Sequence, residues 1–195
     1  MKFKLILLLS LFASLGCPTA KAQGSGTNNL LLSVTNLDLV TATHERVLRI
    51  EGIVPAPAAE VWKAFSTAEG LKTWIAPVVS IDLRVGGVIS THYTKTATIG
   101  SPGTINLPII NYLEGEMLTL KVNLNENFTA KARAEDKNLQ EIIQIIPASS
   151  NSTRVVSSMI GWGTGKEWDD TYKFFSRGNA WTYRELIQSF LPKPK

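Results

Sequence analysis

Apolar and polar positions alternate with a period of two over much of the chain between residues 48 and 162. This alternation is typical of strands that bury one face and expose the other. Short turns such as Gly86-Gly87 and Asn151-Ser152 favour antiparallel pairing of these strands. Pro108 predicts a bulge or an edge position, because proline cannot donate to the ladder. The pattern predicts strands over residues 48–54, 81–85, 88–94, 105–113, 118–124, 139–146 and 153–162.

Three stretches have helical spacing instead. The first begins at Pro57, a residue suited to a first helical position, and the second follows a capping box at Ser66–Glu69. The third follows a capping box at Thr164–Glu167, carries aromatic residues at helical intervals and ends before Pro192. Gly178 lies inside this third helix and costs about 1 kcal/mol relative to alanine, which indicates a kink or a close approach to the sheet.

The order of elements predicts an α+β domain. A strand, two short helices and about six further strands precede one amphipathic helix of about 24 residues, roughly 36 Å long. The aromatic face of that helix has only the concave side of the sheet to pack against. We therefore expect a curved antiparallel sheet of about seven strands around the C-terminal helix, with a cavity between them. The predicted domain covers residues 44–191, after a leader with an edge strand over 23–43 and before a tail over 192–195.

The first 22 residues have the pattern of an export signal. Lys2 and Lys4 precede an apolar run over residues 5–12, and Ala20-Lys21-Ala22 has the small residues of a cleavage site. The run is shorter than the roughly 20 apolar residues that span a bilayer. A second interpretation makes Cys17 a lipidation site, which would anchor the protein to a bacterial envelope. The sequence thus predicts an exported protein, in the periplasm or secreted.

Charge and composition exclude several classes. Cleavage after residue 22 lowers the net charge from +4 to about +1, and the remaining basic residues are scattered, so we expect no nucleic-acid partner. No later apolar stretch is long enough for a transmembrane span. One cysteine and two histidines leave no metal site, and Gly161–Lys166 lacks the spacing of a phosphate-binding loop, so no cofactor is expected.

Four motifs resemble one branch of the helix-grip proteins. They occupy residues 57–65, 69–77, 82–87 and 161–169, and they are similar to the Hsp90-ATPase-activator-homologue-like branch. That superfamily also contains the START lipid-transfer domains and the Bet v 1 allergens. The resemblance implies a seven-stranded sheet that grips the last helix over a hydrophobic pocket. The export signal and the apolar segment over residues 30–43 depart from the family pattern.

The resemblance implies a pocket lined by large side chains. His92 is the weak candidate for a catalytic base, because it lies in a strand and a histidine titrates near neutral pH. Aromatic residues with a polar tip also line small-molecule pockets. The candidate ligand-binding residues are Trp74 at the pocket mouth, His92, Tyr112, Trp162, Tyr172 and Phe175.

Three functions are compatible with these features. The first is a non-catalytic protein that binds a small hydrophobic or amphipathic molecule. The second is an enzyme of the cyclase or hydrolase type that uses His92 with Tyr112 or Tyr172. The third is a chaperone-related module that binds another protein.

Overall fold

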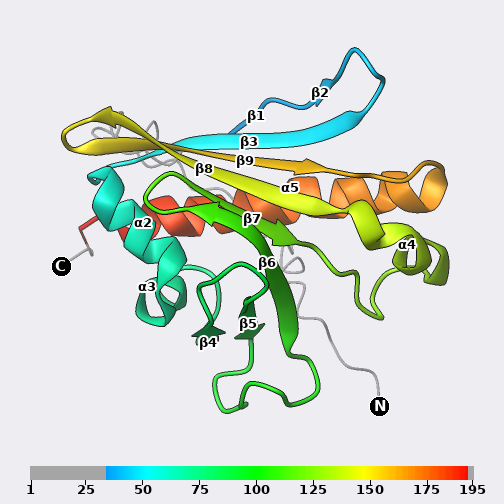
Figure 1. The fold of residues 1–195 in the computed structure, drawn as a ribbon, viewed down its shortest axis with the longest axis horizontal. Coiled ribbons are helices and arrows are strands. Elements are labelled where there is room, and N and C mark those ends of the chain that lie inside the picture. Colours follow the sequence, from blue (N-terminus) through cyan, green and yellow to red (C-terminus); the bar gives the residue numbers. More distant parts are fainter. Residues whose placement is uncertain (1–33, 193–195) are drawn as a thin grey trace, which may run out of the picture.

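Nine antiparallel strands and one long helix form the framework of the described part of the protein (Figure 1). The computed structural model describes residues 34–192, so the predicted export signal and Cys17 lie outside the described residues. The strands are β1 (Val34–Asn36), β2 (Leu39–Val40), β3 (Arg46–Val54), β4 (Val78–Ile81), β5 (Val88–His92), β6 (Ile105–Leu113), β7 (Met117–Lys121), β8 (Gln140–Ser149) and β9 (Ser152–Ile160). The helices are α2 (Ala58–Ser66), α3 (Ala68–Lys72), α4 (Ala130–Glu135), the 3-10 turn η1 (Asp136–Asn138) and α5 (Lys166–Ser189).

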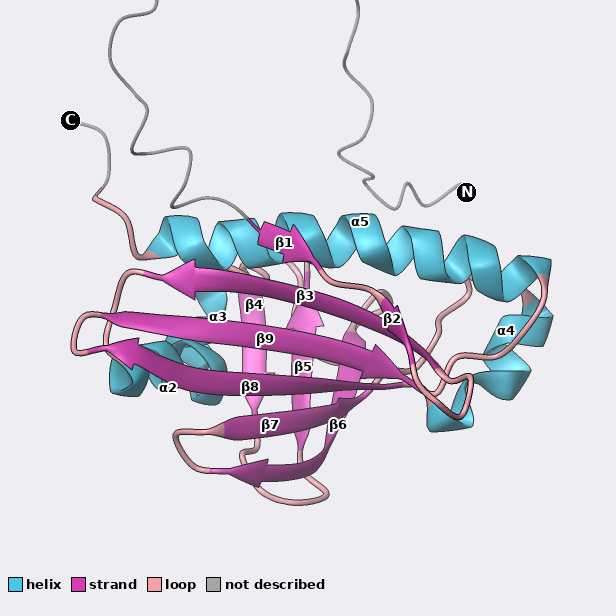
Figure 2. Ribbon diagram, turned by 90° about the horizontal axis from the view of Figure 1, so that it is seen from above, coloured by secondary structure: helices cyan, strands magenta, loops and turns pink. Residues whose placement is uncertain are grey.

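The sheet has the order β1-β3-β9-β8-β7-β6-β5-β4, and β2 pairs with the start of β3. It curves around α5, which lies along one long side of the molecule (Figure 2). The expectation of an α+β helix-grip fold is therefore confirmed. The sheet has nine strands where about seven were expected, and the two short helices follow β3 and not the first strand, because β1 and β2 precede it. The strands β1 and β2 come from the segment ahead of residue 44, and β1 forms one edge of the sheet.

Alternation along the strands directs one face of the sheet towards α5. On β3, β8 and β9 this face carries buried apolar residues such as Ile50, Ile143 and Val155. The helix contributes Trp168, which is 0% exposed, and other buried side chains at spacings of three and four residues. The apolar face that the period of two gives the strands and the apolar face that the period of 3.6 gives the helix thus pack together in one core.

Several local predictions are wrong in detail. The strand expected over residues 81–85 ends at Ile81, because a turn follows in which Asp82 N donates to Val88 O at 2.9 Å and Gly86 has a φ of +76°. Residues 122–124 likewise lie beyond the end of β7. Pro108 belongs to an interior strand, and the predicted bulge is found beside it as a register shift between Ile109 and Asn111.

The helix caps also differ from the predicted ones. The N-cap of α3 is Thr67, whose Oγ1 accepts a hydrogen bond from Gly70 N at 3.0 Å. The capping box predicted at Ser66–Glu69 therefore places the cap one residue too early. The cap of α5 is Gly165, which has no side chain to bond, so the Thr164–Glu167 box is wrong. Pro57 precedes α2 as its cap and is not its first helical residue. A Cβ added at Gly178 would have no atom within 4 Å, so this glycine marks no close approach to the sheet.

One helix has no counterpart among the predicted elements. The helix α4 follows Thr129, whose Oγ1 accepts from Ala132 N at 3.3 Å. Its last residue, Glu135, accepts a hydrogen bond from Trp168 Nε1 at 2.8 Å, which joins α4 to the start of α5. A threonine followed by Ala-Lys-Ala-Arg-Ala-Glu is a helix-start pattern that could have revealed it.

Candidate functional site

Three of the six predicted pocket residues meet at the first half of α5. The ring of Trp162 lies 4.8 Å from that of Tyr172 and 5.9 Å from that of Phe175, measured between centroids. Phe128 stacks on Phe175 at 5.6 Å from the other side, and Trp168 meets Trp162 edge-on at 6.2 Å. The three predicted residues are thus together, but their rings contact one another.

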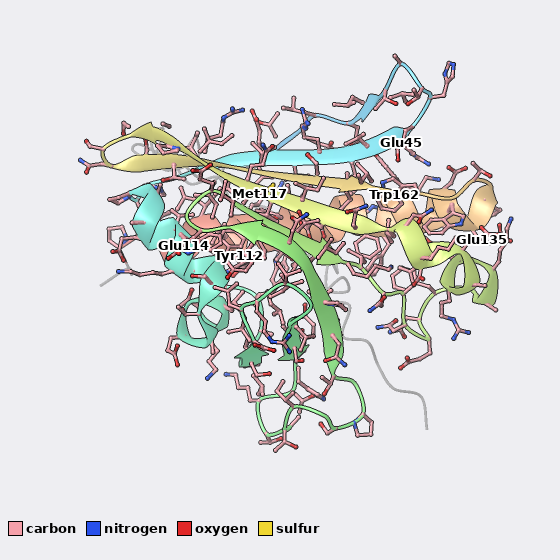
Figure 3. All side chains as sticks on the ribbon, viewed as in Figure 1. Glu45, Tyr112, Glu114, Met117, Glu135 and Trp162 are labelled. Carbon is pink, nitrogen blue, oxygen red and sulfur yellow. The ribbon has the colours of Figure 1, made fainter. Side chains whose placement is uncertain are left out.

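The other two aromatic candidates lie elsewhere. Trp74 is only 7% exposed, donates from Nε1 to Ala64 O at 2.9 Å, and packs edge-on against Phe65 at 4.9 Å. It is therefore a core residue and does not form the mouth of a pocket. Tyr112 stacks on Trp62 of α2 at 6.4 Å and lies well away from Trp162 (Figure 3).

His92 holds the loop between β5 and β6. Its Nδ1 accepts from Thr94 N at 3.0 Å, which leaves the ring proton on Nε2, within 3.1 Å of Pro102 O. The side chain is 7% exposed, and both ring nitrogens are used by the loop backbone. These bonds give His92 a structural role, with neither Tyr112 nor Tyr172 among its hydrogen-bond partners.

A polar cluster that the sequence analysis missed lies between the sheet and α5. Glu141 Oε1 on β8 accepts from Ser157 Oγ on β9 at 2.5 Å and from Tyr183 Oη on α5 at 2.9 Å. Burial raises the pKa of Glu141, and the two hydrogen bonds partly oppose that rise. Burial, and then the charge of Glu141, raise the pKa of Tyr183. The signal was available, since Glu141 shares its parity with Ile143 and Ile145 on an otherwise apolar face.

The two best-defined hollows in the described part of the chain are both lined by residues of the β1–β2 segment, at the edge of the sheet and not beneath its middle strands. The larger has a volume of about 270 Å³, and the smaller, about 70 Å³, lies between β1, β3 and the start of β9. The larger one, which we call the arm groove, lies between the β1–β2 arm, the start of β3 and the first half of α5. Its lining residues are Asp38, Leu39, Val40, Arg46 and Tyr172.

One wall of the arm groove is polar. The Arg46 guanidinium stacks 3.6 Å above the Tyr172 ring centroid, and its Nη1 donates to Asp169 Oδ1 at 2.7 Å. Tyr172 Oη donates to Val47 O at 3.3 Å. Burial, and then the nearby Asp38 carboxylate, raise the pKa of Tyr172, so its hydroxyl stays protonated at neutral pH. This wall offers hydrogen-bond donors from Arg46 and an acceptor from Asp38.

The opposite wall is apolar and exposed. Val40 is 65% exposed and Leu39 is 37% exposed, although both are large apolar residues. Hydrophobic side chains rimmed by charged groups on a surface mark a place where another molecule binds. Of the six predicted site residues, Tyr172 alone lines this groove. The other lining residues come from the apolar segment that departs from the family pattern, and from Arg46 just after it.

Comparison with known proteins identifies the family. The model of the family described as activator of Hsp90 ATPase homolog 1-like protein matches residues 55–190. The chain belongs to this family. The family resemblance in the sequence is therefore confirmed, and the arm residues 38–46 lie ahead of the matched region. The sequence matches none of the curated proteins with which it was compared.

Solved structures agree with the helix-grip fold. A conserved protein of unknown function from Enterococcus faecalis has a TM-score of 0.58 and 16% identity, over 84% of this chain and 82% of that one. The Aha1 dimer from Colwellia psychrerythraea has a TM-score of 0.57 and 14% identity, over 76% and 98%. CalU16 from Micromonospora echinospora has a TM-score of 0.57 and 15% identity, over 83% and 88%. At these identities the likeness extends to the fold alone.

Family and fold together point to a ligand-binding or chaperone-related domain. Within residues 34–192, no helix is both long and apolar enough to cross a membrane. No group of three or more potential metal ligands occurs in this described part either.

Proposed function

We propose that this protein is an exported, non-catalytic binder of a small amphipathic molecule, and that the molecule binds in the arm groove. The observation that carries the proposal is the pairing of an exposed apolar wall with a polar wall around one hollow. The volume of about 270 Å³ is close to the lower end of the roughly 300–1,000 Å³ of small-molecule sites. The groove therefore suits a ligand smaller than a lipid with two acyl chains.

The two walls suggest how such a ligand is oriented. Its apolar part covers Leu39 and Val40, which removes their side chains from water. Its polar end accepts hydrogen bonds from Arg46. The guanidinium has five N–H groups, and the structure places one of them on Asp169, so the others are free for a carboxylate or hydroxyl group.

The proposal that the protein is non-catalytic rests on the hydrogen bonds of two residues, His92 and Glu141. A general base needs a free nitrogen or oxygen within reach of the proton it removes. His92 uses both ring nitrogens in the β5–β6 loop, and Glu141 is bonded to Ser157 and Tyr183 inside the grip. Neither residue lines the arm groove.

Export is proposed from the first 22 residues, with cleavage after Ala22. The protein is then periplasmic or secreted, or it stays on the envelope through a lipid on Cys17. In either form the chain from residue 23 onward contains every described helix and strand.

Binding can be tested with an amphipathic fluorescent probe, anilinonaphthalene sulfonate, titrated into the chain from residue 23 onward. The informative variant is Val40→Asp, and the matched control is Val85→Asp, because Val85 is 63% exposed in the β4–β5 turn. We expect saturable binding that Val40→Asp weakens about tenfold, equivalent to about 1.4 kcal/mol. The control should bind like the wild type. No saturable binding, or equal weakening by both substitutions, would contradict the proposal.

A further inference from the structure

The outward face of α5 carries aromatic and basic side chains together. Trp181 is 53% exposed and Phe174 is 39% exposed. Lys173, Arg177 and Arg184 are exposed on the same side of the helix, at spacings of four and seven residues. We call these five residues the outer face of α5. In Figure 2 this helix lies along one long side of the described molecule.

The basic residues of this face are not neutralised by the described structure. The ion pairs found within residues 34–192 include none with Lys173, Arg177 or Arg184. The acid Asp170, one turn earlier, is bonded to Lys166 at 2.6 Å, and Glu185 is the one acid beside the face on its C-terminal side. The outer face therefore presents a net positive charge next to an exposed indole ring.

The shape of the face limits what it can bind. From Lys173 to Arg184 the helix rises about 17 Å and is about 10 Å wide, so its projected area is roughly 200 Å². A stable protein interface buries about 800 Å² on each partner. None of the five outer-face residues lines either of the two best-defined hollows of the described chain. A convex, basic and aromatic strip instead matches a flat, anionic surface.

We propose that the outer face of α5 docks this protein on an anionic lipid surface. Tryptophan favours the membrane–water interface, because its ring is apolar and its N–H is polar. Lysine and arginine stems lie along that interface while their charged ends reach lipid phosphates. Gly178 adds no side chain between Phe174 and Trp181, so both rings can approach the surface. The docking is separate from ligand binding in the arm groove.

The edge strand β1 lies beside α5. Asn36 Nδ2 donates to Ser176 Oγ at 3.1 Å, so the chain enters the described domain beside α5. A lipid on Cys17 would add a second attachment to the same lipid surface. The proposal does not depend on that lipid, and its test uses the chain from residue 23 onward, which lacks Cys17.

The test is co-sedimentation with vesicles of phosphatidylcholine, with and without an equal share of phosphatidylglycerol. The face variant combines Lys173→Gln, Arg177→Gln and Arg184→Gln. The control variant combines Lys63→Gln, Arg84→Gln and Lys131→Gln, which removes the same charge from other exposed positions.

We expect the wild type to bind the anionic vesicles and not the neutral ones. Each basic residue near an anionic surface contributes about fivefold, so the face variant should bind roughly 100-fold more weakly. The control should stay within about threefold, because distant charges are screened beyond ~10 Å at 0.1 M salt. Trp181→Ala should weaken binding severalfold without moving the urea midpoint. Absence of vesicle binding, equal binding to neutral vesicles, or equal losses in the two triple variants would overturn the proposal, and the first result would favour an acidic protein as the partner.

Discussion

Gly163 is a position where one added methyl group should have a large effect. It lies in the loop that leads into α5, and a Cβ added there would be 2.0 Å from Trp168 Nε1 and 2.3 Å from Trp168 Cε2. Ordinary contacts of a Cβ are 3.4 Å or longer. Trp168 is 0% exposed and cannot turn away without moving its neighbours. We therefore expect Gly163→Ala to displace the indole and break its hydrogen bond to Glu135.

The magnitude follows from those two effects. Loss of a hydrogen bond to a carboxylate costs about 1.5–3 kcal/mol. Overpacking of a filled core costs about 1–3 kcal/mol, and alanine recovers about 0.5 kcal/mol by restricting the unfolded chain. The free energy of unfolding should therefore fall by about 2–5 kcal/mol. With a urea slope of about 2 kcal/mol/M, the midpoint should move down by about 1–2.5 M.

Gly178→Ala is the matched control, because no atom lies within 4 Å of its added Cβ. Alanine in the middle of an exposed helix face should raise the free energy of unfolding by about 1 kcal/mol. Both variants are measured by urea unfolding, followed by far-UV circular dichroism. If Gly163→Ala unfolds within about 0.5 kcal/mol of the wild type, or if both variants shift in the same direction, the contact between Gly163 and Trp168 does not have the importance argued for it.

Two further predictions concern partly buried polar groups. Glu141→Gln keeps an acceptor for Ser157 and Tyr183 but cannot ionise. Because the pKa of Glu141 is raised in the folded state, protonation stabilises the fold at low pH, and this contribution is lost as the pH rises through the raised pKa. The variant should therefore become more stable than the wild type as the pH increases above about 4.5, by about 1.4 kcal/mol for each unit by which the pKa of Glu141 is raised. The measurement is urea unfolding from about pH 4 to 8, and a stability difference that does not change with pH would refute the prediction. Lys121 Nζ donates to Val122 O and Asp136 O, both at 2.6 Å. Lys121→Met should lower the free energy of unfolding by about 3 kcal/mol, because these carbonyls lose their donor. The control Lys131→Met replaces an exposed lysine and should change the free energy of unfolding by less than about 0.5 kcal/mol. Equal effects of the two substitutions would show that the hydrogen bonds of Lys121 contribute little.

Much of the architecture could be predicted from local pattern. The residues of β6 and the length of α5 follow from alternation and helical spacing, because each strand or helix needs one apolar face for the core. The N-cap of α3 could not be chosen from local pattern, since Ser66 and Thr67 are both good caps and only the geometry of the α2–α3 junction selects Thr67. Three of the aromatic residues predicted for the pocket, Trp162, Tyr172 and Phe175, do lie together, but pattern alone does not say whether rings line a hollow or fill it.

The sequence by itself determined the helix-grip fold and its family, because periodicity and motif spacing are properties of the chain. Tertiary structure decided how the pieces meet. It brought Glu141 to Tyr183 across 42 residues, tied both nitrogens of His92 to a loop, and placed the β1–β2 arm against Tyr172 to form the groove. The Glu141–Tyr183 contact and the groove join residues that are far apart in sequence, so their distances depend on how the sheet curves around α5 and not on any local preference. The partners of His92 lie within its own β5–β6 loop, and the path of that loop decides which of them it reaches.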